Sequence, residues 1–438
     1  MKATLCLILF LNLSVWSLLG QVHFTRLNNE DGLSHSEVKA ILQDSYGYMW
    51  ISTRNKLNRY DGCEFKVLDC YDSIANKRNN NTAALCEDMN RLLWVGTDEG
   101  VFIYDPVVET FTYLERWLNL QDAGFLYNWV SNIVADKEGN MWIVLPSCGI
   151  LKVNVQTKAY KLYSNLGHTV FEKGGPLSLT VDGQGAVWVG CIDQGICRYD
   201  KTKDDFVQVL EETGVFRGKG VYAMLSCKES LFVALHEGRL LRYNKETGTL
   251  ALHDFPEVDN VMIRCLMMPK DEELWVGTNN GVYIYNLLTE NCTVFRNDSF
   301  DSHSLSCNTV TDMYIDKEKG IWVGTLYGGL NYQSRSAGNF TVYIPNDHPQ
   351  SVQSQWIHGL YWDADMQKLW VGTEDEGCSV FDKKTSEFSR ISARHTAPIT
   401  YIRKINGNIW IGYFKNGLDI ISPSMKITHY SSFELGLR

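Results

Sequence analysis

The chain has 438 residues, 12% of them aromatic, and a formal net charge of −10 from 41 Lys and Arg against 51 Asp and Glu. Nucleic-acid binding is not expected, because phosphate backbones are bound by clustered Lys and Arg and the sequence contains no basic block. Length alone would allow two or three domains, so the internal pattern of the sequence must decide the domain organisation.

Residues 1–20 are expected to form a signal peptide. Lys2 supplies a positive charge, the segment 3–19 is almost wholly apolar, and Gly20-Gln21 is a suitable cleavage point. The alternative is an uncleaved anchor, but the apolar run is short for a span of about 20 residues and Asn12 interrupts it. Because no later segment is long and apolar enough to cross a bilayer, the cleaved chain is expected to be exported without a transmembrane segment.

One short pattern then returns nine times: a large aromatic residue, a β-prone run and usually a glycine. The anchors recur every 40 to 48 residues, a period typical of the four-stranded blades of a β-propeller. The sequence therefore predicts an all-β fold. The clearest copies begin at Trp94, Trp275, Trp322 and Trp370, and the weaker ones at Trp50, Trp142, Trp188, Phe232 and Trp410.

Each copy predicts four antiparallel strands, as the seventh illustrates with Val310–Ile315, Ile321–Thr325, Leu330–Gln333 and Phe340–Tyr343. The anchor Trp is expected to fill the wedge between blades, and the glycine to let the neighbouring blade come close. An Asp precedes the anchor by six residues in five copies, which predicts a turn of fixed geometry. Calcium loops are the alternative, but their alternating oxygen ligands are missing. These residues are Asp44, Asp88, Asp136, Asp182 and Asp316.

The repeats are expected to divide into a seven-bladed propeller over 21–340 and about two blades of a second propeller over 341–438. The segment Phe24–Leu27 resembles Phe340–Tyr343, so we expect it to supply the fourth strand of the seventh blade and close the first ring. Deleting residues 21–28 should then lower thermal stability sharply. The alternative is a single ring of nine blades. Glu434–Leu437 echoes Glu30–Leu33, as though a tenth repeat were beginning.

The repeats also resemble a known family. Asp44–Thr53 followed by Leu57–Gly62, the lead-in Asp31–Ser34, and Ser304–Leu330 are similar to the regulator-propeller repeats of hybrid two-component sensors of Bacteroides-type gut bacteria. The resemblance implies a periplasmic region that senses breakdown products of glycans and controls genes for their use. In that family two seven-bladed propellers precede a β-sandwich, a membrane helix, a histidine kinase and a DNA-binding regulator. This sequence has nine repeats and no kinase motif, so the chain is not expected to signal alone.

Propeller ligands usually bind on the face formed by the loops between the second and third strands and by the connections between blades, where variable loops sit on a rigid scaffold. On that face the first hairpin loop contains Arg54 and Lys56 where other loops contain glycine. These cations could hold an anionic sugar or belong to a solvated turn.

Two groups of aromatic residues outside the anchors are further candidates, because aromatic rings stack on sugars and polar neighbours bind hydroxyl groups. Trp129 and Trp356 occupy equivalent positions, seven residues before the turn residues Asp136 and Asp363. The alternative is that these rings seal blade edges or mediate dimerisation. The two groups are Trp117, Tyr127 and Trp129, and Trp356, His358 and Trp362.

Binding is expected rather than catalysis. A glycosidase needs two facing carboxylates and a lyase needs a positioned base, and the sequence cannot show that any of its loop residues converge. No zinc spacing, nucleophile elbow or phosphate loop occurs, so neither a metal nor a cofactor is expected. The expected partner is an oligosaccharide, and the alternatives are a second copy of the chain or an intact sensor. The loop candidates for catalysis are Asp193, His236, Glu237, Glu374, Asp375 and Glu376.

Overall fold

The computed structural model describes residues 23–121, 123–166, 170–172, 174–210, 214–235, 238–253, 261–299, 301–335, 343, 345, 350–391 and 397–436. These residues form nine four-stranded antiparallel sheets and one two-stranded hairpin. The chain divides into two compact units, residues 1–298 with 302–338 and residues 299–301 with 339–438. Seven of the sheets belong to the first unit and two to the second, which confirms the predicted fold class.

The first six blades of the first unit each use four consecutive strands, and the strand nearest the centre comes first in the chain. They are β2(Val38–Gln43), β3(Met49–Thr53), β4(Leu57–Tyr60) and β5(Phe65–Leu68); β8(Thr82–Glu87), β9(Leu93–Thr97), β10(Gly100–Asp105) and β11(Thr110–Tyr113); β12(Asn132–Ala135), β13(Asn140–Leu145), β14(Gly149–Asn154) and β15(Tyr160–Ser164); β16(Pro176–Val181), β17(Val187–Cys191), β18(Gly195–Asp200) and β19(Asp205–Gln208); β20(Val221–Cys227), β21(Ser230–Leu235), β22(Leu240–Asn244) and β23(Leu250–His253); and β24(Ile263–Lys270), β25(Glu273–Thr278), β26(Gly281–Asn286) and β27(Cys292–Phe295).

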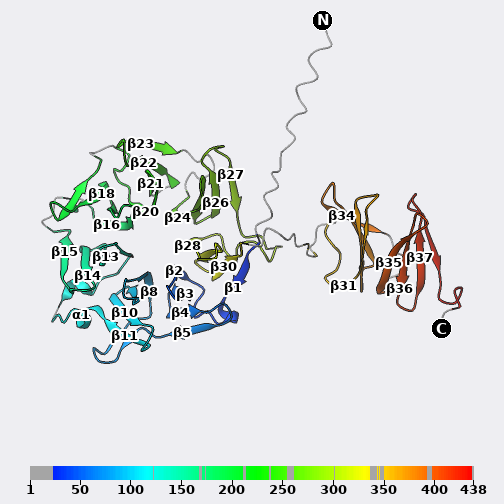
Figure 1. Cartoon of the computed structure of the whole chain (residues 1–438), viewed down its shortest axis with the longest axis horizontal. Helices are drawn as coiled ribbons and strands as arrows, with labels where there is room; N and C mark the ends of the chain where they lie inside the picture. The colour runs from blue at the N-terminus through cyan, green and yellow to red at the C-terminus, as the bar shows by residue number, and fades with distance from the viewer. Residues whose placement is uncertain are drawn as a thin grey trace, which may run out of the picture. The chain divides into compact units, whose positions relative to one another are not determined.

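The seventh blade combines both ends of the first unit. Its strands β28(Val310–Ile315), β29(Ile321–Thr325) and β30(Leu330–Gln333) are completed by β1(Thr25–Leu27), which pairs antiparallel with β30 (Figure 1). Phe24, just before β1, is 1% exposed, and the Arg26 guanidinium donates to Ser304 Oγ at 2.8 Å. The predicted closure by the N-terminal strand is therefore confirmed, and the single nine-bladed ring is wrong. Phe340 lies outside the described residues.

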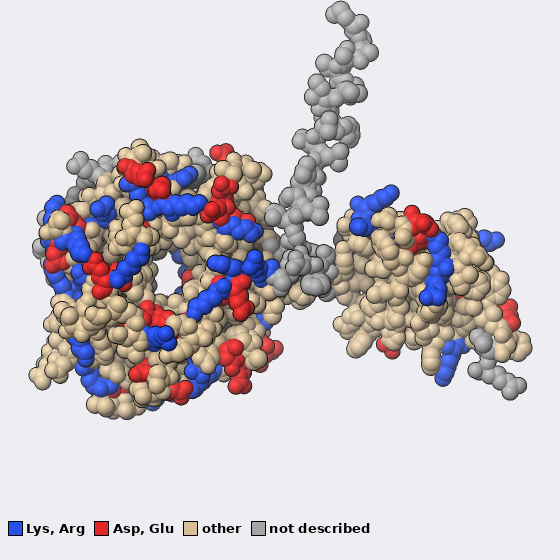
Figure 2. Space-filling model, in the orientation of Figure 1, with Lys and Arg blue, Asp and Glu red and all other residues tan. Residues whose placement is uncertain are grey.

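The inner strands of the seven blades contact one another in sequence, and β28 contacts β2. This closed arrangement leaves an opening through the ring (Figure 2).

A buried hydrogen bond ties the predicted turn Asp to the anchor Trp. Trp94 Nε1 donates to Asp88 Oδ2 at 2.8 Å, while Asp88 Oδ1 accepts the backbone N–H groups of Asn90 and Leu92 at 2.8 and 3.0 Å. One carboxylate thus fixes the turn and satisfies the indole N–H, so neither polar group is buried without a partner. The same indole–carboxylate bond joins Trp50 to Asp44, Trp142 to Asp136, Trp188 to Asp182 and Trp322 to Asp316.

The glycine of the repeat is a contact between blades. A Cβ added at Gly96 would lie 2.6 Å from Val130 Cγ1 of the next blade, so only a residue without a side chain lets the two sheets approach this closely. In the first blade Ser52 replaces the glycine and Thr82 replaces the valine, and Ser52 Oγ donates to Thr82 Oγ1 at 2.9 Å. The same packing joins Gly190 to Val221, Gly277 to Val310, Gly324 to Val38 and, in the second unit, Gly372 to Ile399.

The seam between the seventh and first blades holds a carboxyl group with an unusual pKa. Ile41 N donates to Asp312 Oδ2 at 2.8 Å, and Met313 N donates to Asp312 Oδ1 at 2.9 Å. Burial raises the pKa of Asp312 to about 7, above the value of about 3.9 for an unfolded Asp. Between about pH 4 and about pH 7, Asp312 stays protonated in the folded chain but is ionised in the unfolded chain. The free energy of unfolding therefore falls as the pH rises through this range.

We expect the Asp312→Asn variant to melt below the parent protein at pH 5, because its amide nitrogen cannot accept the second backbone N–H. The variant should gain stability relative to the parent by pH 8, because only the parent then carries the buried charge. Thermal unfolding followed by circular dichroism at both pH values measures the difference. An equal difference at both pH values would contradict the assignment.

The second unit contains two blades, β31(Ile357–Asp363), β32(Lys368–Thr373), β33(Cys378–Asp382) and β34(Glu387–Ile391), then β35(Ile399–Ile405), β36(Asn408–Tyr413), β37(Gly417–Ile421) and β38(Ile427–Tyr430). Smaller elements are η1(Asn29–Asp31), the hairpin β6(Tyr71–Asp72) and β7(Lys77–Arg78), α1(Leu114–Trp117) and η2(Gly124–Leu126). No helix among the described residues has the length and apolar character needed to cross a membrane.

Candidate ligand site at the mouth of the first ring

Three equivalent positions begin neighbouring inner strands on the face that carries the hairpin loops and the blade connections. Glu37, Asn81 and Trp129 each precede the first core residue of their blade, seven positions before the turn Asp. Because the inner strands of neighbouring blades pack on one another around the ring, these three positions lie at the same end of adjacent inner strands, and the ring they surround is open at its centre (Figure 2).

A chain of polar contacts connects these positions. Lys39 Nζ donates to Asn81 Oδ1 at 2.5 Å, and Asn81 Nδ2 donates to Asp98 Oδ2 at 2.8 Å. Arg54 lies 3.6 Å from the Glu37 carboxylate. Cationic donors, anionic acceptors and the neutral Asn81 amide thus alternate across the first two blades. Such an arrangement suits a ligand with many hydroxyl groups. We call Glu37, Lys39, Arg54, Asn81, Asp98 and Trp129 the mouth cluster.

The backbone on either side of Trp129 is bonded to the hairpin loop of the second blade. The neighbouring backbone is fixed, because Gly100 N donates to Asn128 O at 3.0 Å and Val130 N donates to Thr97 O at 2.9 Å. These two bonds flank the loop that carries Asp98. Trp129 itself is 51% exposed, so a backbone that is held on both sides presents a large aromatic surface to solvent.

The predicted cations Arg54 and Lys56 both lie on this face, and each has a carboxylate partner. Lys56 Nζ is 3.2 Å from Asp69, and its backbone is left-handed, with φ of 78°. Glycine holds the same hairpin position in the second blade, at Gly100 with φ of 102°. A lysine in this conformation costs roughly 1–2 kcal/mol relative to glycine, and the same left-handed backbone occurs in other turns of the chain, at Lys319 and Lys415 among others.

The structure separates the residues of the first aromatic group. Trp117 is partly buried and packs edge-on against the anchor Trp94 at 5.5 Å, with the Lys158 ammonium 4.6 Å from its ring centroid. Tyr127 donates from its hydroxyl to Glu115 Oε2 at 2.6 Å, and Lys77 of the inserted hairpin lies 4.4 Å above its ring. Trp117 therefore supports the blade core, while Tyr127 forms part of a separate surface built by inserted segments.

The second aromatic group divides in the same way. Trp356 is 57% exposed, and its carbonyl accepts Glu374 N at 3.0 Å. His358 Nε2 lies 3.6 Å from Glu374 Oε2, so these three residues share one end of the eighth blade. Trp362, 41% exposed, is six residues farther along β31, which at ~3.3 Å per residue places it about 20 Å from Trp356.

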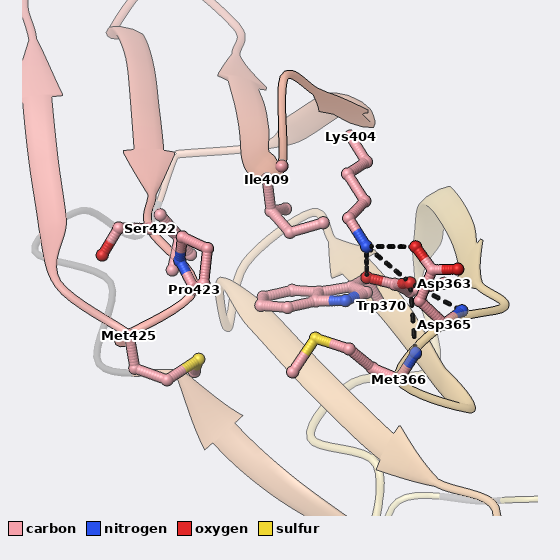
Figure 3. Close-up of a pocket in the computed structure, with 11 residues that line it drawn as sticks. Asp363, Asp365, Met366, Trp370, Lys404, Ile409, Ser422, Pro423 and Met425 are labelled. Carbon is pink, nitrogen blue, oxygen red and sulfur yellow. Dashed lines mark hydrogen bonds and ion pairs between the residues drawn. The ribbon is translucent and has the colours of Figure 1, made fainter.

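A cavity of about 360 Å³ lies between the two sheets of the second unit (Figure 3). Lys404 Nζ bonds both Asp363 and Asp365 at its edge, and Met366 and Trp370 are among the apolar residues that line it. Asp363 is seven residues before Trp370 instead of six and binds Lys404. The Trp370 indole N–H accordingly has no hydrogen-bond partner in the described part of the chain.

The described residues contain no group of His, Cys, Asp and Glu arranged to hold a metal ion. Among the catalytic candidates, His236 and Glu237 lie outside the described residues, and the Asp193 carboxylate accepts the Gly218 backbone N–H at 2.5 Å. Cys191 and Cys197, which flank a hairpin loop, are buried thiols with their sulfur atoms 3.9 Å apart.

Sequence reasoning missed four residues of the mouth cluster. Glu37 and Asn81 could have been found by the count that identified Trp129, because they lie seven residues before Asp44 and Asp88. Lys39 lies between Val38 and Ala40 at a register shift in β2, and the same shift recurs in the inner strands of seven other blades. Asp98 lies in one of several similar hairpin loops, and only its contact with Asn81 distinguishes it from the other loop residues.

The comparisons with known proteins agree with this architecture. A two-component regulator propeller model matches residues 32–55 and 304–327. A 166-residue stretch is 25% identical to histidine kinase P4 of Formosa agariphila, covering 36% of this chain and 12% of that protein.

Two solved structures share the fold. The extracellular domain of the hybrid two-component system BT3049 from B. thetaiotaomicron has a TM-score of 0.69 at 20% identity, covering 93% of this chain and 54% of that one. The extracellular domain of the one-component system BT4673 from the same organism has a TM-score of 0.60 at 18% identity, covering 95% and 68%. This chain spans about half of the BT3049 domain. It is thus a propeller protein with two-component regulator repeats in its first and seventh blades.

Proposed function

We propose that this chain is the exported ligand-sensing region of a two-component signalling system, and that the mouth cluster binds an oligosaccharide. The regulator-propeller repeats and the fold shared with extracellular sensor domains support the class of protein. The apolar leader at residues 1–20 supports a periplasmic location. Signalling would then pass to a histidine kinase, the activity named in the F. agariphila relative.

The observation that carries the ligand class is the polar chain from Lys39 through Asn81 to Asp98 beside the exposed Trp129. A sugar offers hydroxyl groups to such donors and acceptors and an apolar ring face to an indole. Binding, with no covalent step, is the role this arrangement suits.

An oligosaccharide library measured by thermal shift, followed by calorimetry of any hit, tests the proposal. A ligand at a hundredfold excess over its Kd should stabilise the protein by about 2.7 kcal/mol. Trp129→Ala should weaken binding at least tenfold, through loss of the stacking surface. Tyr46→Ala is the matched control, because Tyr46 is 50% exposed but stands on a turn at the opposite ends of the strands. Equal affinity in both variants would refute the site.

Protein binding by the second unit is a second candidate function. Leu360 and Trp362 on β31 are 62% and 41% exposed, and Tyr401 and Ile405 on β35 are 52% and 42% exposed. Exposed apolar rows of this kind often mark contacts with other proteins. Leu360→Ser combined with Trp362→Ser should then abolish any self-association seen by sedimentation, and unchanged association would exclude this surface.

A further inference from the structure

Lys39 is the member of the mouth cluster whose charge is least compensated. Lys39 lies between Val38 and Ala40, where the pairing of β2 with β3 shifts register, as it does at this position in most blades. A β-bulge of this kind often re-aims a side chain. Its ammonium donates to the neutral Asn81 amide at 2.5 Å, and burial lowers the pKa of Lys39. Among the described residues it forms no ion pair, so a partly dehydrated cation retains unused donors.

The carboxylates nearest to Lys39 are engaged elsewhere. Asp98 accepts the Asn81 amide N–H at 2.8 Å, and Glu37 lies 3.6 Å from Arg54. The side chain of Glu37 is only 18% exposed. Neither acid thus forms an ion pair with the Lys39 ammonium, although the negative charges of both act against the lowering of the Lys39 pKa by burial.

Arg54 is a second cation that can turn toward a ligand. Its side chain is 67% exposed and its contact with Glu37 is long, at 3.6 Å, so the two residues form a weak surface ion pair. The adjacent backbone is held, because Thr53 N donates to Thr82 Oγ1 at 3.0 Å and Lys56 N donates to Asn80 O at 2.7 Å. These bonds place Arg54 beside Asn81, the residue that receives the Lys39 ammonium.

We infer that the mouth cluster selects acidic oligosaccharides, with the oxyanion of the sugar bound by Lys39 and Arg54. The oxyanion is the carboxylate of a uronic acid or the sulfate ester of a sulfated sugar, and both suit an ammonium and a guanidinium. Asp98 then accepts hydroxyl groups and Trp129 contacts the sugar ring. The inference rests on the proposed function and adds the chemical class of the ligand.

Calorimetry on the full chain with three sets of oligosaccharides tests the inference: galacturonate and glucuronate oligomers, sulfated galactan oligomers, and neutral galactose and glucose oligomers of the same lengths. An acidic set should bind and its neutral counterpart should bind at least tenfold more weakly. Lys39→Met should weaken binding of the acidic oligosaccharides by about tenfold or more, as expected for loss of a charged hydrogen bond. The affinity of this variant should also depend less on salt concentration. The uronate and sulfate sets distinguish the two sources of the oxyanion.

Two further variants make the outcome decisive. Lys39→Arg keeps the charge and should retain most of the affinity, which separates loss of charge from misfolding. Lys66→Met removes a lysine from the outer strand β5, where it pairs with Glu109 at 2.5 Å, and should leave binding within twofold. If neutral oligomers bind through Trp129 while acidic ones do not, or if Lys39→Met binds normally, the inference fails and the proposed function stands. If no oligosaccharide binds, both fail.

Discussion

Removing residues 21–28 is expected to lower the melting temperature of this protein sharply, because the seventh blade would lose its outer strand. The deletion exposes the edge of β30, which β1 covers over Thr25–Leu27, and removes Phe24, which is 1% exposed. Truncating a buried phenylalanine to alanine typically lowers the free energy of unfolding by roughly 3–5 kcal/mol. The loss of ring closure adds to that amount, since the seventh and first blades then meet without a strand that joins them.

Differential scanning calorimetry of the deletion and of two point variants measures the effect. Phe24→Ala should reproduce roughly 3–5 kcal/mol of the destabilisation, whereas Thr25→Ala, on an exposed residue of the same strand, should change stability by no more than about 0.5 kcal/mol. A deletion that melts like the parent protein would show that β1 does not hold the ring closed.

The second large effect is expected at Trp94. Trp94→Ala should cost roughly 3–5 kcal/mol, because the indole is fully buried and also satisfies Asp88 Oδ2. Trp94→Phe should keep much of the packing but leave Asp88 Oδ2 without its hydrogen-bond donor, at a cost of about 1–3 kcal/mol. Chemical denaturation followed by tryptophan fluorescence and circular dichroism gives both values.

Trp370→Phe is the matched control for the hydrogen bond. Trp370 is as buried as Trp94, but its indole N–H has no partner among the described residues. Removing that N–H should therefore cost less than the same change at Trp94. Equal losses at the two positions would mean that packing alone accounts for the stabilisation by the anchor residues.

Most of the fold could be predicted from the sequence because each blade carries its own local signals. The turn residues and the strand lengths recur along the chain, and the Asp–Trp spacing recurs in five of the nine copies, so the strand order followed from the repeat. Closure by β1 followed from the likeness of its sequence to an outer strand. The inserted hairpin β6–β7 was missed, since its two-residue strands are too short to produce a periodic pattern.

The candidate site was less predictable, because it depends on contacts between blades. The indole of Trp129 was found by its position, yet its polar neighbours come from segments 30 to 90 residues earlier in the chain. The grouping of Trp117 with Trp129 likewise depended on contacts that the sequence does not give. The two lie in one connection, but Trp117 at the end of α1 packs on the anchor Trp94, whereas the backbone at Asn128 and Val130 is bonded to the hairpin loop of the second blade.

The contact of Ser52 with Thr82 has a consequence for how such a ring diverges. In five other places a glycine faces a valine or isoleucine of the next blade, and a side chain on the glycine side alone would overlap its neighbour. The serine in the first blade stands against a threonine, and the two hydroxyl groups are hydrogen-bonded. At this joint of the first blade a hydrogen-bonded pair therefore takes the place of the close glycine contact, so Ser52 and Thr82 are expected to tolerate substitution together better than singly.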